Sequence, residues 1–323
     1  AASDVYKRQI ALNLNVFLLD VAKVLKRVPC GASISRAFNS FRHGHIAEQF
    51  DSICDQAARE MNVSGADVRP EGAVNDGPIW VFWWQGLESA PARVKACVDS
   101  IKRNASNRDV FVITKDNVQE YTDLPDYVFR KLAEGKITLT HFSDILRFNL
   151  LKLHGGLWMD ATLYAVRPLD SHRYSGLFFT CSGYPDPTFF NVSDGRWTGF
   201  FIGGVREEPL FEFMDRFFAL YWEQNDSLAD YFLIDYALDY AYRNRIGSLK
   251  TWCEGERGKD NPELFDLAPV ICDSFDSNVL KRLTERTDVF KLSWKKPASY
   301  PKDSFGDRLV REMSFDKTEG NVS

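Results

Sequence analysis

Three charged residues, Asp144, Arg147 and Asp160, lie within apolar runs of the stretch 138–170. Asp144 and Arg147 fall in a segment from about Thr140 to His154 whose leucines, isoleucine and phenylalanines predict a largely buried helix. Because they are three positions apart, the two side chains lie next to each other on one face of that helix. A buried pair of opposite charges is costly unless other groups complete its hydrogen bonding. The pair therefore indicates either a structural ion pair or a site for a polar ligand.

The third charged residue, Asp160, follows the pair Gly155-Gly156 in a run typical of a β-strand, LWMDATLYAV. We predict that it lies in the middle of this strand. Side chains alternate along a strand, so Trp158, Asp160 and Thr162 share one face. A carboxylate and a hydroxyl spaced in this way can hold a divalent cation through oxygen ligands, with a flat group beside the tryptophan. The alternative is an edge strand on which Asp160 faces water.

The residue types in this stretch match the parts of a nucleotide-sugar. Arginine has a planar fork of donors that suits phosphate and sugar oxygens, and aspartate accepts hydrogen bonds from sugar or ribose hydroxyls. A base can stack on a tryptophan, and the run IWVFWWQG offers Trp80, Trp83 and Trp84. Tryptophans in a strand are also common in protein cores. These tryptophans therefore indicate either a base-binding surface or ordinary packing.

A second group of candidates lies near the C-terminus, where KLSWKK brings together Lys291, Ser293 and Trp294. Lysine is a compact cation that can bind a diphosphate leaving group. A lysine near the end of a chain is otherwise simply solvated.

The overall composition describes a globular chain of 323 residues with 45% hydrophobic and 14% aromatic residues. A formal net charge of -5 gives no electrostatic basis for binding nucleic acid, which we exclude as a partner. The six cysteines show no metal-binding spacing and are typical of reduced core thiols in a cytoplasmic protein. No run reaches the roughly 20 apolar residues of a membrane span.

The elements that must position these residues alternate between strands and helices from residue 78 onward, which indicates an α/β fold. Residues 78–86 form a strand that is apolar on both faces, as an interior parallel strand is. A helix from about Pro91 to Asn104 and a strand at 109–115 complete a βαβ unit. Further strands are expected at 176–183, 199–205 and 289–292, and helices from Glu207 and Leu228.

Residues 1–77 are predicted to form a helical N-terminal extension, in which residues 1–9 resemble translated adapter sequence. The helix that starts at Ile10 is amphipathic and ends in Lys23, Lys26 and Arg27. Ordinary packing is one interpretation of this helix, and contact with an anionic membrane surface is the other. We expect a solvated face around His43 and His45. A segment rich in turn formers, 63–78, separates the extension from an α/β domain at 78–300, and 301–323 is predicted to be a polar tail.

Several motifs together resemble a known family. IWVFWWQGLESAP, GKITLTHFSDILRFNLLKLHGGLWMDATL, DYFLID and KLSWK are similar to segments of the bacterial capsular polysaccharide synthesis proteins. These are relatives of glycosyltransferase family 32 and, more distantly, of the large clostridial glucosylating toxins. The resemblance covers roughly residues 78 to 296, and its most specific part is SDILR followed by GGLWMDAT. It implies a GT-A fold, a nucleotide-sugar donor, a divalent metal (Mn²⁺ or Mg²⁺), and transfer with retention at the anomeric carbon.

The resemblance also implies roles for individual residues. Trp83 matches the tryptophan near the base, Asp144 and Arg147 match the pair that contacts the donor, and Asp160 matches the first aspartate of the DXD motif. The sequence departs from that motif at Thr162, where the family's last aspartate commonly binds the metal. In DYFLID, Asp235 is expected to be a further active-site carboxylate.

Together these observations predict a cytoplasmic glycosyltransferase that uses a glycan or lipid-linked acceptor in surface polysaccharide synthesis, with peripheral contact at the inner membrane as an added option. Two alternatives are a catalytically silent sugar-nucleotide or glycan-binding module, which Thr162 favours, and a metal-dependent phosphotransferase with Asp160 as its nucleophile. The second alternative calls for another acidic residue two positions on, which Ala161-Thr162 does not supply.

Overall fold

The computed structural model describes residues 2–27, 31–61, 74–169, 174–183, 186–256, 260–295, 297 and 299–311. At its centre is a mixed sheet with the strand order β2-β1-β3-β6-β5. Strand β1 lies between two parallel neighbours, β2 and β3, whereas β6 is antiparallel to both β3 and β5. The strands are β1 (Ile79–Phe82), β2 (Val110–Ile113), β3 (Gly156–Met159), β5 (Phe178–Thr180) and β6 (Phe201–Gly204). The predicted α/β fold with an interior first strand is confirmed, and the GT-A assignment stays a prediction.

Both faces of this sheet are covered by helices, because its side chains alternate between two hydrophobic clusters. Trp80, Trp158 and Ile202 point to one side and pack with α7 (Leu139–His154) and α9 (Pro209–Gln224). Their neighbours Val81, Leu157 and Phe201 point to the other side and pack with α4 (Ala92–Asn104). The remaining helices around the sheet are η1 (Leu87–Ser89), α5 (Val118–Tyr121), α6 (Asp126–Ala133), α10 (Leu233–Arg243) and α11 (Leu249–Glu256).

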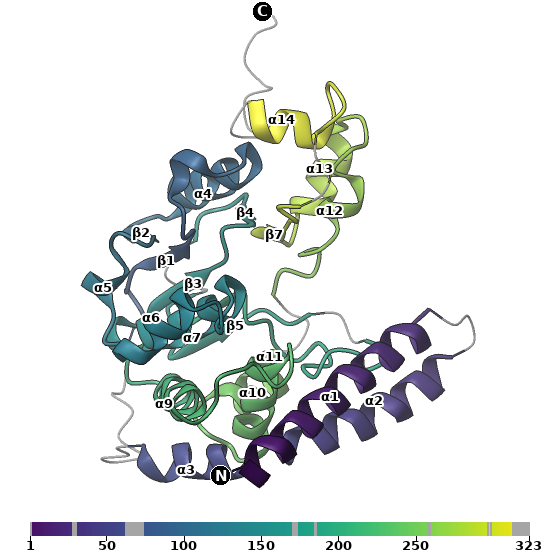
Figure 1. The fold of residues 1–323 in the computed structure, drawn as a ribbon. Helices are drawn as coiled ribbons and strands as arrows, with labels where there is room; N and C mark the ends of the chain where they lie inside the picture. Colours follow the sequence, from purple (N-terminus) through teal and green to yellow (C-terminus); the bar gives the residue numbers. More distant parts are fainter. Residues whose placement is uncertain are drawn as a thin grey trace, which may run out of the picture.

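A small second sheet joins the C-terminal part of the chain to the rest. It pairs β4 (Leu163–Ala165) with β7 (Val289–Lys291) in antiparallel register. Beside it lie α12 (Leu267–Val270), α13 (Ser277–Thr284) and α14 (Phe305–Arg311), at the end of the molecule opposite α3 (Figure 1). Phe305 and Leu309 of α14 are buried in a cluster that includes α4. The start of the predicted polar tail is therefore a packed helix, because these two apolar residues have a partner surface.

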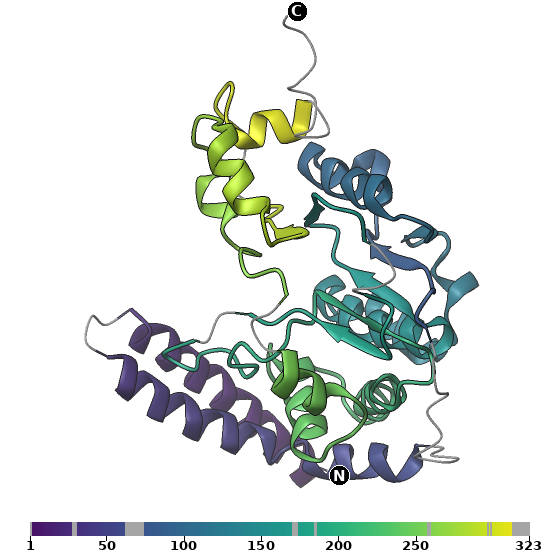
Figure 2. The ribbon, with the colours of Figure 1, turned by 180° about the vertical axis from the view of Figure 1, so that it is seen from behind.

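In the region predicted to be a helical extension, the described residues form α1 (Ala2–Leu25), α2 (Ala32–Ala47) and α3 (Asp51–Glu60). Helices α1 and α2 form a hairpin that runs alongside α10 and the segment before β6 (Figures 1 and 2). Helix α3 packs on α9, and its Ile53, Cys54 and Ala57 belong to the same hydrophobic cluster as α7 and α9. The extension thus shares a core with the central sheet.

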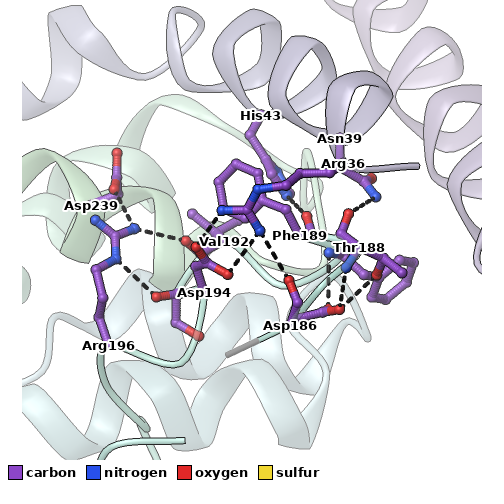
Figure 3. A network of polar contacts seen from close by, with 12 residues as sticks. Arg36, Asn39, His43, Asp186, Thr188, Phe189, Val192, Asp194, Arg196 and Asp239 are labelled. Atoms are coloured by element: carbon purple, nitrogen blue, oxygen red, sulfur yellow. Dashed lines mark hydrogen bonds and ion pairs between the residues drawn. The ribbon is translucent and has the colours of Figure 1, made fainter. Parts of the chain in front are cut away.

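Polar contacts fix the segment 186–196 between α2 and α10 (Figure 3). From α2, the Arg36 guanidinium donates to the Asp186 carbonyl at 3.1 Å and pairs with the Asp194 carboxylate at 2.8 Å. The Asn39 amide donates to the Thr188 carbonyl at 2.9 Å. From the other end of the segment, Arg196 pairs at 2.8 Å with Asp239 of α10. The segment is therefore held from both sides immediately before it reaches the central sheet.

The prediction of a solvated face around His43 is wrong, because this side chain is buried. His43 Nε2 lies 3.0 Å from the Phe189 carbonyl, and Nδ1 lies 2.9 Å from the Tyr236 hydroxyl. Burial, followed by the neighbouring Arg42 charge, lowers the pKa of His43 to about 4. Its partners lie 146 and 193 positions away, so local polarity alone did not reveal them.

The lowered pKa of His43 predicts a loss of stability in acid. The unfolded chain binds the proton near the ordinary pKa of 6.5 and the folded chain only near 4, so stability is full above 6.5 and falls as the pH drops towards 4. From this group alone we expect up to about 3 kcal/mol lower free energy of unfolding at low pH. Urea unfolding across this range should show a shallower dependence for His43→Gln, whereas the control His45→Gln should follow the parent protein. Equal slopes for the parent and His43→Gln would contradict the assignment.

The remaining predictions for the N-terminal half and the cysteines have mixed outcomes. Among the described residues, no helix is both long enough and apolar enough to cross a membrane. At the basic end of α1, Lys23 pairs with Asp20 at 2.9 Å and Lys26 lies 4.5 Å from the centre of the Phe190 ring. Membrane contact by this helix stays a prediction. Within the described ranges no disulfide links the cysteines, and four of them are buried: Cys54, Cys97, Cys181 and Cys253. Cys30 and most of the 63–78 segment lie outside the described residues.

A candidate active site at the end of the central strand

Asp160 stands at the carboxyl end of β3, immediately after Met159. Its backbone N–H donates to the Phe200 carbonyl at 2.9 Å, and its own carbonyl accepts from Leu163 N–H at 2.9 Å, which closes a tight turn. The predicted mid-strand position is therefore wrong, because LWMDATLYAV divides into β3 and β4, which pair in different sheets. The edge-strand alternative is also wrong, since β3 lies between β1 and β6.

Two glycines at the start of β3 are required because the backbone passes very close to neighbouring backbone segments. Gly155 and Gly156 have φ of 64° and 95°, in the region that favours glycine. A Cβ atom at Gly156 would lie 2.1 Å from the Pro78 carbonyl oxygen. This turn carries the chain from the end of α7 into the middle of the sheet, and so brings the helix and Asp160 to one site.

The Asp160 carboxylate is held by three donors. Lys291 Nζ lies 2.6 Å from Oδ2, Trp158 Nε1 donates to Oδ1 at 3.0 Å, and the Arg147 guanidinium lies 3.5 Å from Oδ1. Burial raises the pKa of this carboxyl, but the Lys291 and Arg147 charges and the two hydrogen bonds outweigh it, so the pKa lies below its ordinary value. Asp160 is therefore an anion at neutral pH.

The predicted pair on α7 is present, and it faces Asp160. Arg147 is only 4% exposed and donates to Asp144 Oδ1 at 3.0 Å, while its guanidinium carbon lies 5.0 Å from the centre of the Trp158 ring. Gly199 allows this approach, because a Cβ atom there would come within 3.0 Å of the guanidinium. Arg147 Nε is buried and has no hydrogen-bond partner among the described residues. The arginine thus bridges two carboxylates and keeps one buried donor unused.

Asp235 lies in the first turn of α10 and faces the same space. Its carboxylate Oδ1 accepts a hydrogen bond from Trp197 Nε1 at 2.9 Å. Burial raises the pKa of Asp235 to about 6, the nearby Asp144 charge adds to the rise, and the Trp197 hydrogen bond opposes it. Four residues that the sequence analysis selected therefore line one cavity: Asp144 and Arg147 from α7, Asp160 from the end of β3, and Asp235 from α10.

Two cavities meet at Asp160. The first, of about 550 Å³, is called here the aromatic chamber, and its lining includes Trp83, Trp84, Trp158, Trp294 and Thr162. The second, of about 250 Å³, is called the acidic chamber, and its lining includes Asp144, Arg147, Asp235, Phe200 and Tyr231. Both chambers are also lined by Thr140, Ser143 and Asp160, so they adjoin along the start of α7 and the end of β3.

Two other sequence candidates lie apart from the chambers. Trp80 is 2% exposed and donates from its indole to the Gly155 carbonyl at 2.9 Å, so it is a core residue. Ser293 is not among the described residues that line either chamber, and its carbonyl accepts a hydrogen bond from Arg93. Trp83 and Trp294 instead meet edge to face, with ring centres 6.0 Å apart.

A comparison of the sequence with models of protein families decides the relationship. The family described as "Capsular polysaccharide synthesis protein" matches residues 32–309. The chain belongs to this family. The match begins at the first residue of α2 and ends within α14, so it includes both chambers and the helices α2 and α3.

Several curated proteins that are similar to this chain are named glycosyltransferases. "Glycosyltransferase afumC" of Aspergillus fumigatus is 27% identical over 164 residues, which is 47% of this chain and 42% of that protein. "O-glycosyltransferase braB" of Annulohypoxylon truncatum is 26% identical over 105 residues, 30% of this chain and 25% of the relative. "Uncharacterized glycosyltransferase L373" of Acanthamoeba polyphaga mimivirus is 25% identical over 153 residues, 46% and 57% of the two chains. The chain matches less than two thirds of the length of each of these relatives.

The side chains that contact the Asp160 carboxylate are nitrogen donors, whereas a divalent metal such as Mg²⁺ or Mn²⁺ is bound mainly by oxygen ligands. Both Asp160 oxygens already bond nitrogen donors, and the hydroxyl two positions on belongs to Thr162. The described residues contain no group of three or more His, Cys, Asp or Glu side chains able to hold an ion. Two unit charges 4 Å apart interact by roughly 4 kcal/mol near a protein surface, and a divalent ion beside the Lys291 ammonium doubles that repulsion.

Several residues that line the two chambers were not predicted from the sequence. Tyr231 lines the acidic chamber and is 64% exposed, and Phe200 lies under the Lys291 ammonium, 4.3 Å from its ring centre. Thr140 and Ser143 line both chambers from the N-terminal part of α7. The sequence could have indicated Thr140 and Ser143 only through their position, because they lie shortly before Asp144 on the same helix.

Proposed function

We propose that the chain is a glycosyltransferase that moves a hexose from a nucleotide-sugar to a glycan or lipid-linked acceptor in surface polysaccharide synthesis. The observation that carries this proposal is the junction of an aromatic and an acidic chamber at Asp160, flanked by Arg147 and Lys291. A nucleotide-sugar has the same order of parts: a flat base, a polyanion and a polar ring. The proposal includes a GT-A-like domain at 78–300.

In this arrangement the base stacks in the aromatic chamber against Trp83 or Trp294. The diphosphate then lies by Lys291 and by Arg147, which lines the acidic chamber and can donate to phosphate oxygens. The hexose enters the acidic chamber, where Asp144 and Asp235 accept from its hydroxyls. The exposed Tyr231 offers the acceptor a stacking surface at the mouth of the chamber.

The chemistry needs charge stabilisation more than it needs a strong base. The bond between the anomeric carbon and the phosphate oxygen breaks, and its electron pair stays on the departing diphosphate. The acceptor oxygen forms the new bond on the same face of the sugar, and its proton passes to the departing phosphate oxygen. Arg147 and Lys291 stabilise the negative charge that develops, which is a large contribution in a partly buried site. This step retains the anomeric configuration.

A phosphotransferase that uses Asp160 as its nucleophile fits less well. The Lys291, Trp158 and Arg147 donors engage both carboxylate oxygens. The position that would hold a partner acid is Thr162, whose backbone carbonyl accepts a hydrogen bond from Leu292 N–H at the end of the small sheet. A phosphorylated Asp160 trapped from a nucleotide donor would reverse this preference.

The proposal is tested by screening nucleotide-sugars for thermal stabilisation and then measuring release of the nucleoside diphosphate. A donor present at about 100 times its Kd stabilises the folded chain by roughly 2.7 kcal/mol, which is a clear shift in melting temperature. Trp83→Ala should weaken donor binding at least about tenfold through the lost stacking surface, and Phe17→Ala on exposed α1 should not. Binding without any turnover would favour the silent module, and no binding by any nucleotide-sugar would overturn the proposal.

A further inference from the structure

The feature that carries a further inference is the cation beside Asp160. Lys291 comes from β7 of the small sheet, 131 positions away, and its ammonium lies 2.6 Å from Asp160 Oδ2. This is where an ion held by the DXD aspartate would be expected to bind. We propose that Lys291 takes the place of the divalent metal in this protein, so that donor binding and transfer need no metal ion. The inference rests on the proposed function and goes beyond it.

Three contacts position Lys291 independently of any ligand, two through its backbone and one through its ammonium. The residue is in β7, where its backbone pairs with Leu163 and its N–H donates to the Leu264 carbonyl at 2.7 Å. Along the side chain, the ammonium lies 4.3 Å from the centre of the Phe200 ring, within the range of a cation–π contact. The Lys291 side chain is 21% exposed, so it is not fully enclosed by its neighbours. A cation that the fold holds in place and leaves partly exposed is preorganised for an oxyanion.

The charges around the site support the same inference. Asp144, Arg147, Asp160 and Lys291 form a connected group of two anions and two cations, with Arg147 bridging both carboxylates. A diphosphate that binds here can take hydrogen bonds from both cations without adding a metal. A divalent ion on Asp160 would instead have to displace Lys291 from Oδ2 and remain close to a second positive charge. Lysine and arginine thus supply the two positive charges that a divalent cation supplies elsewhere.

The same geometry explains why Thr162 can stand where the family's second aspartate is expected. A second carboxylate at this position would add negative charge beside the diphosphate, and with no ion present nothing would compensate it. Thr162 is 8% exposed and lines the aromatic chamber next to Asp160. A threonine at this position provides a polar hydroxyl without adding a negative charge. Lys291 and Thr162 are therefore complementary parts of one metal-free arrangement.

The test measures binding of nucleoside diphosphates by titration calorimetry, in chelator and then with added Mn²⁺. We expect the parent protein to bind its preferred diphosphate equally well in both. Lys291→Met keeps the aliphatic part of the side chain but removes the charge, and should weaken binding by about 10- to 100-fold in both buffers. Lys291→Glu pairs a second carboxylate with Asp160, so its weakened binding should be rescued by Mn²⁺. Lys281→Glu on α13 makes the same charge change away from the site and should match the parent.

Each outcome separates this inference from the proposed function. If the parent protein binds a diphosphate only when Mn²⁺ is present, the metal-free inference is overturned and the glycosyltransferase proposal stands. If no diphosphate binds in either buffer, the proposed function fails instead. Direct titration of Mn²⁺ without nucleotide gives a readout that does not depend on activity: we expect no binding by the parent and binding by Lys291→Glu. Tight binding of Mn²⁺ by the parent would also overturn the inference.

Discussion

Replacement of Arg147 by methionine is expected to lower donor turnover at least about 100-fold, because it removes a preorganised donor from the developing charge on the diphosphate. Methionine retains most of the apolar volume against Trp158. The substitution also leaves Asp144 and Asp160 without the cation that bridges them, and loss of one partner of a largely buried pair costs about 3 kcal/mol or more. Steady-state release of nucleoside diphosphate measures the first effect, and thermal unfolding measures the second.

The controls for Arg147 separate charge, shape and stability. Arg147→Lys keeps the positive charge but lacks the planar set of donors of the guanidinium. Relative to Arg147→Met, it should therefore recover much of the stability but little of the activity. Arg216→Met removes a partly exposed arginine that pairs with Glu60 at the surface, and should change stability little and leave activity unchanged. An Arg147→Met protein with full turnover would contradict the assignment of the site.

Asp235→Asn should make the protein more stable at neutral pH while reducing transfer. The folded-state pKa of about 6 lies above the ordinary 3.8, so the folded chain favours the protonated carboxyl. The stability that this group contributes is therefore fully present below about pH 4 and is lost as the pH rises through about 6. Asparagine can still accept the Trp197 hydrogen bond and carries no charge to bury, so the gain above pH 7 should be about 2 to 3 kcal/mol.

The measurement for Asp235 is urea unfolding of the parent and the variant at both ends of this pH range. The two curves should coincide in acid and separate at neutral pH, with the variant the more stable. Transfer should fall, because a carboxylate that costs folding energy is retained for its contact with substrate. A variant of equal stability at neutral pH, or one with unchanged transfer, would argue that Asp235 is an ordinary core residue.

The local parts of the site were predictable because short-range rules determine them. The apolar period from Thr140 to His154 and the glycine that follows gave helix α7 to within a residue. Spacing alone placed Asp144 beside Arg147. The alternation of side chains likewise put Trp158 next to Asp160, where the two hydrogen bond.

The long-range parts could not be predicted from one sequence. Nothing in LWMDATLYAV marks a break, and the run divides at Asp160 because β6 pairs with its first half and β7 with its second. The contact between Lys291 and Asp160 spans 131 positions. From the sequence, Lys291 was therefore interpreted either as a solvated residue or as a phosphate ligand, and Asp160 was not identified as its partner. His43 was misjudged for the same reason, since its polar neighbours in sequence are not its neighbours in space.

The hydrogen bonds between α2 and segment 186–196 also indicate which parts of the chain the site depends on. The segment leads directly to Trp197, which holds Asp235, and to Gly199, which makes room for Arg147. A gene rearrangement that kept residues 78–311 and lost α2 would strip this wall of the site of Arg36, Asn39 and His43. Helices α2 and α3 therefore belong to the same structural unit as the sheet that carries the site. The family match agrees with that unit, because it begins at the first residue of α2 and leaves α1 outside.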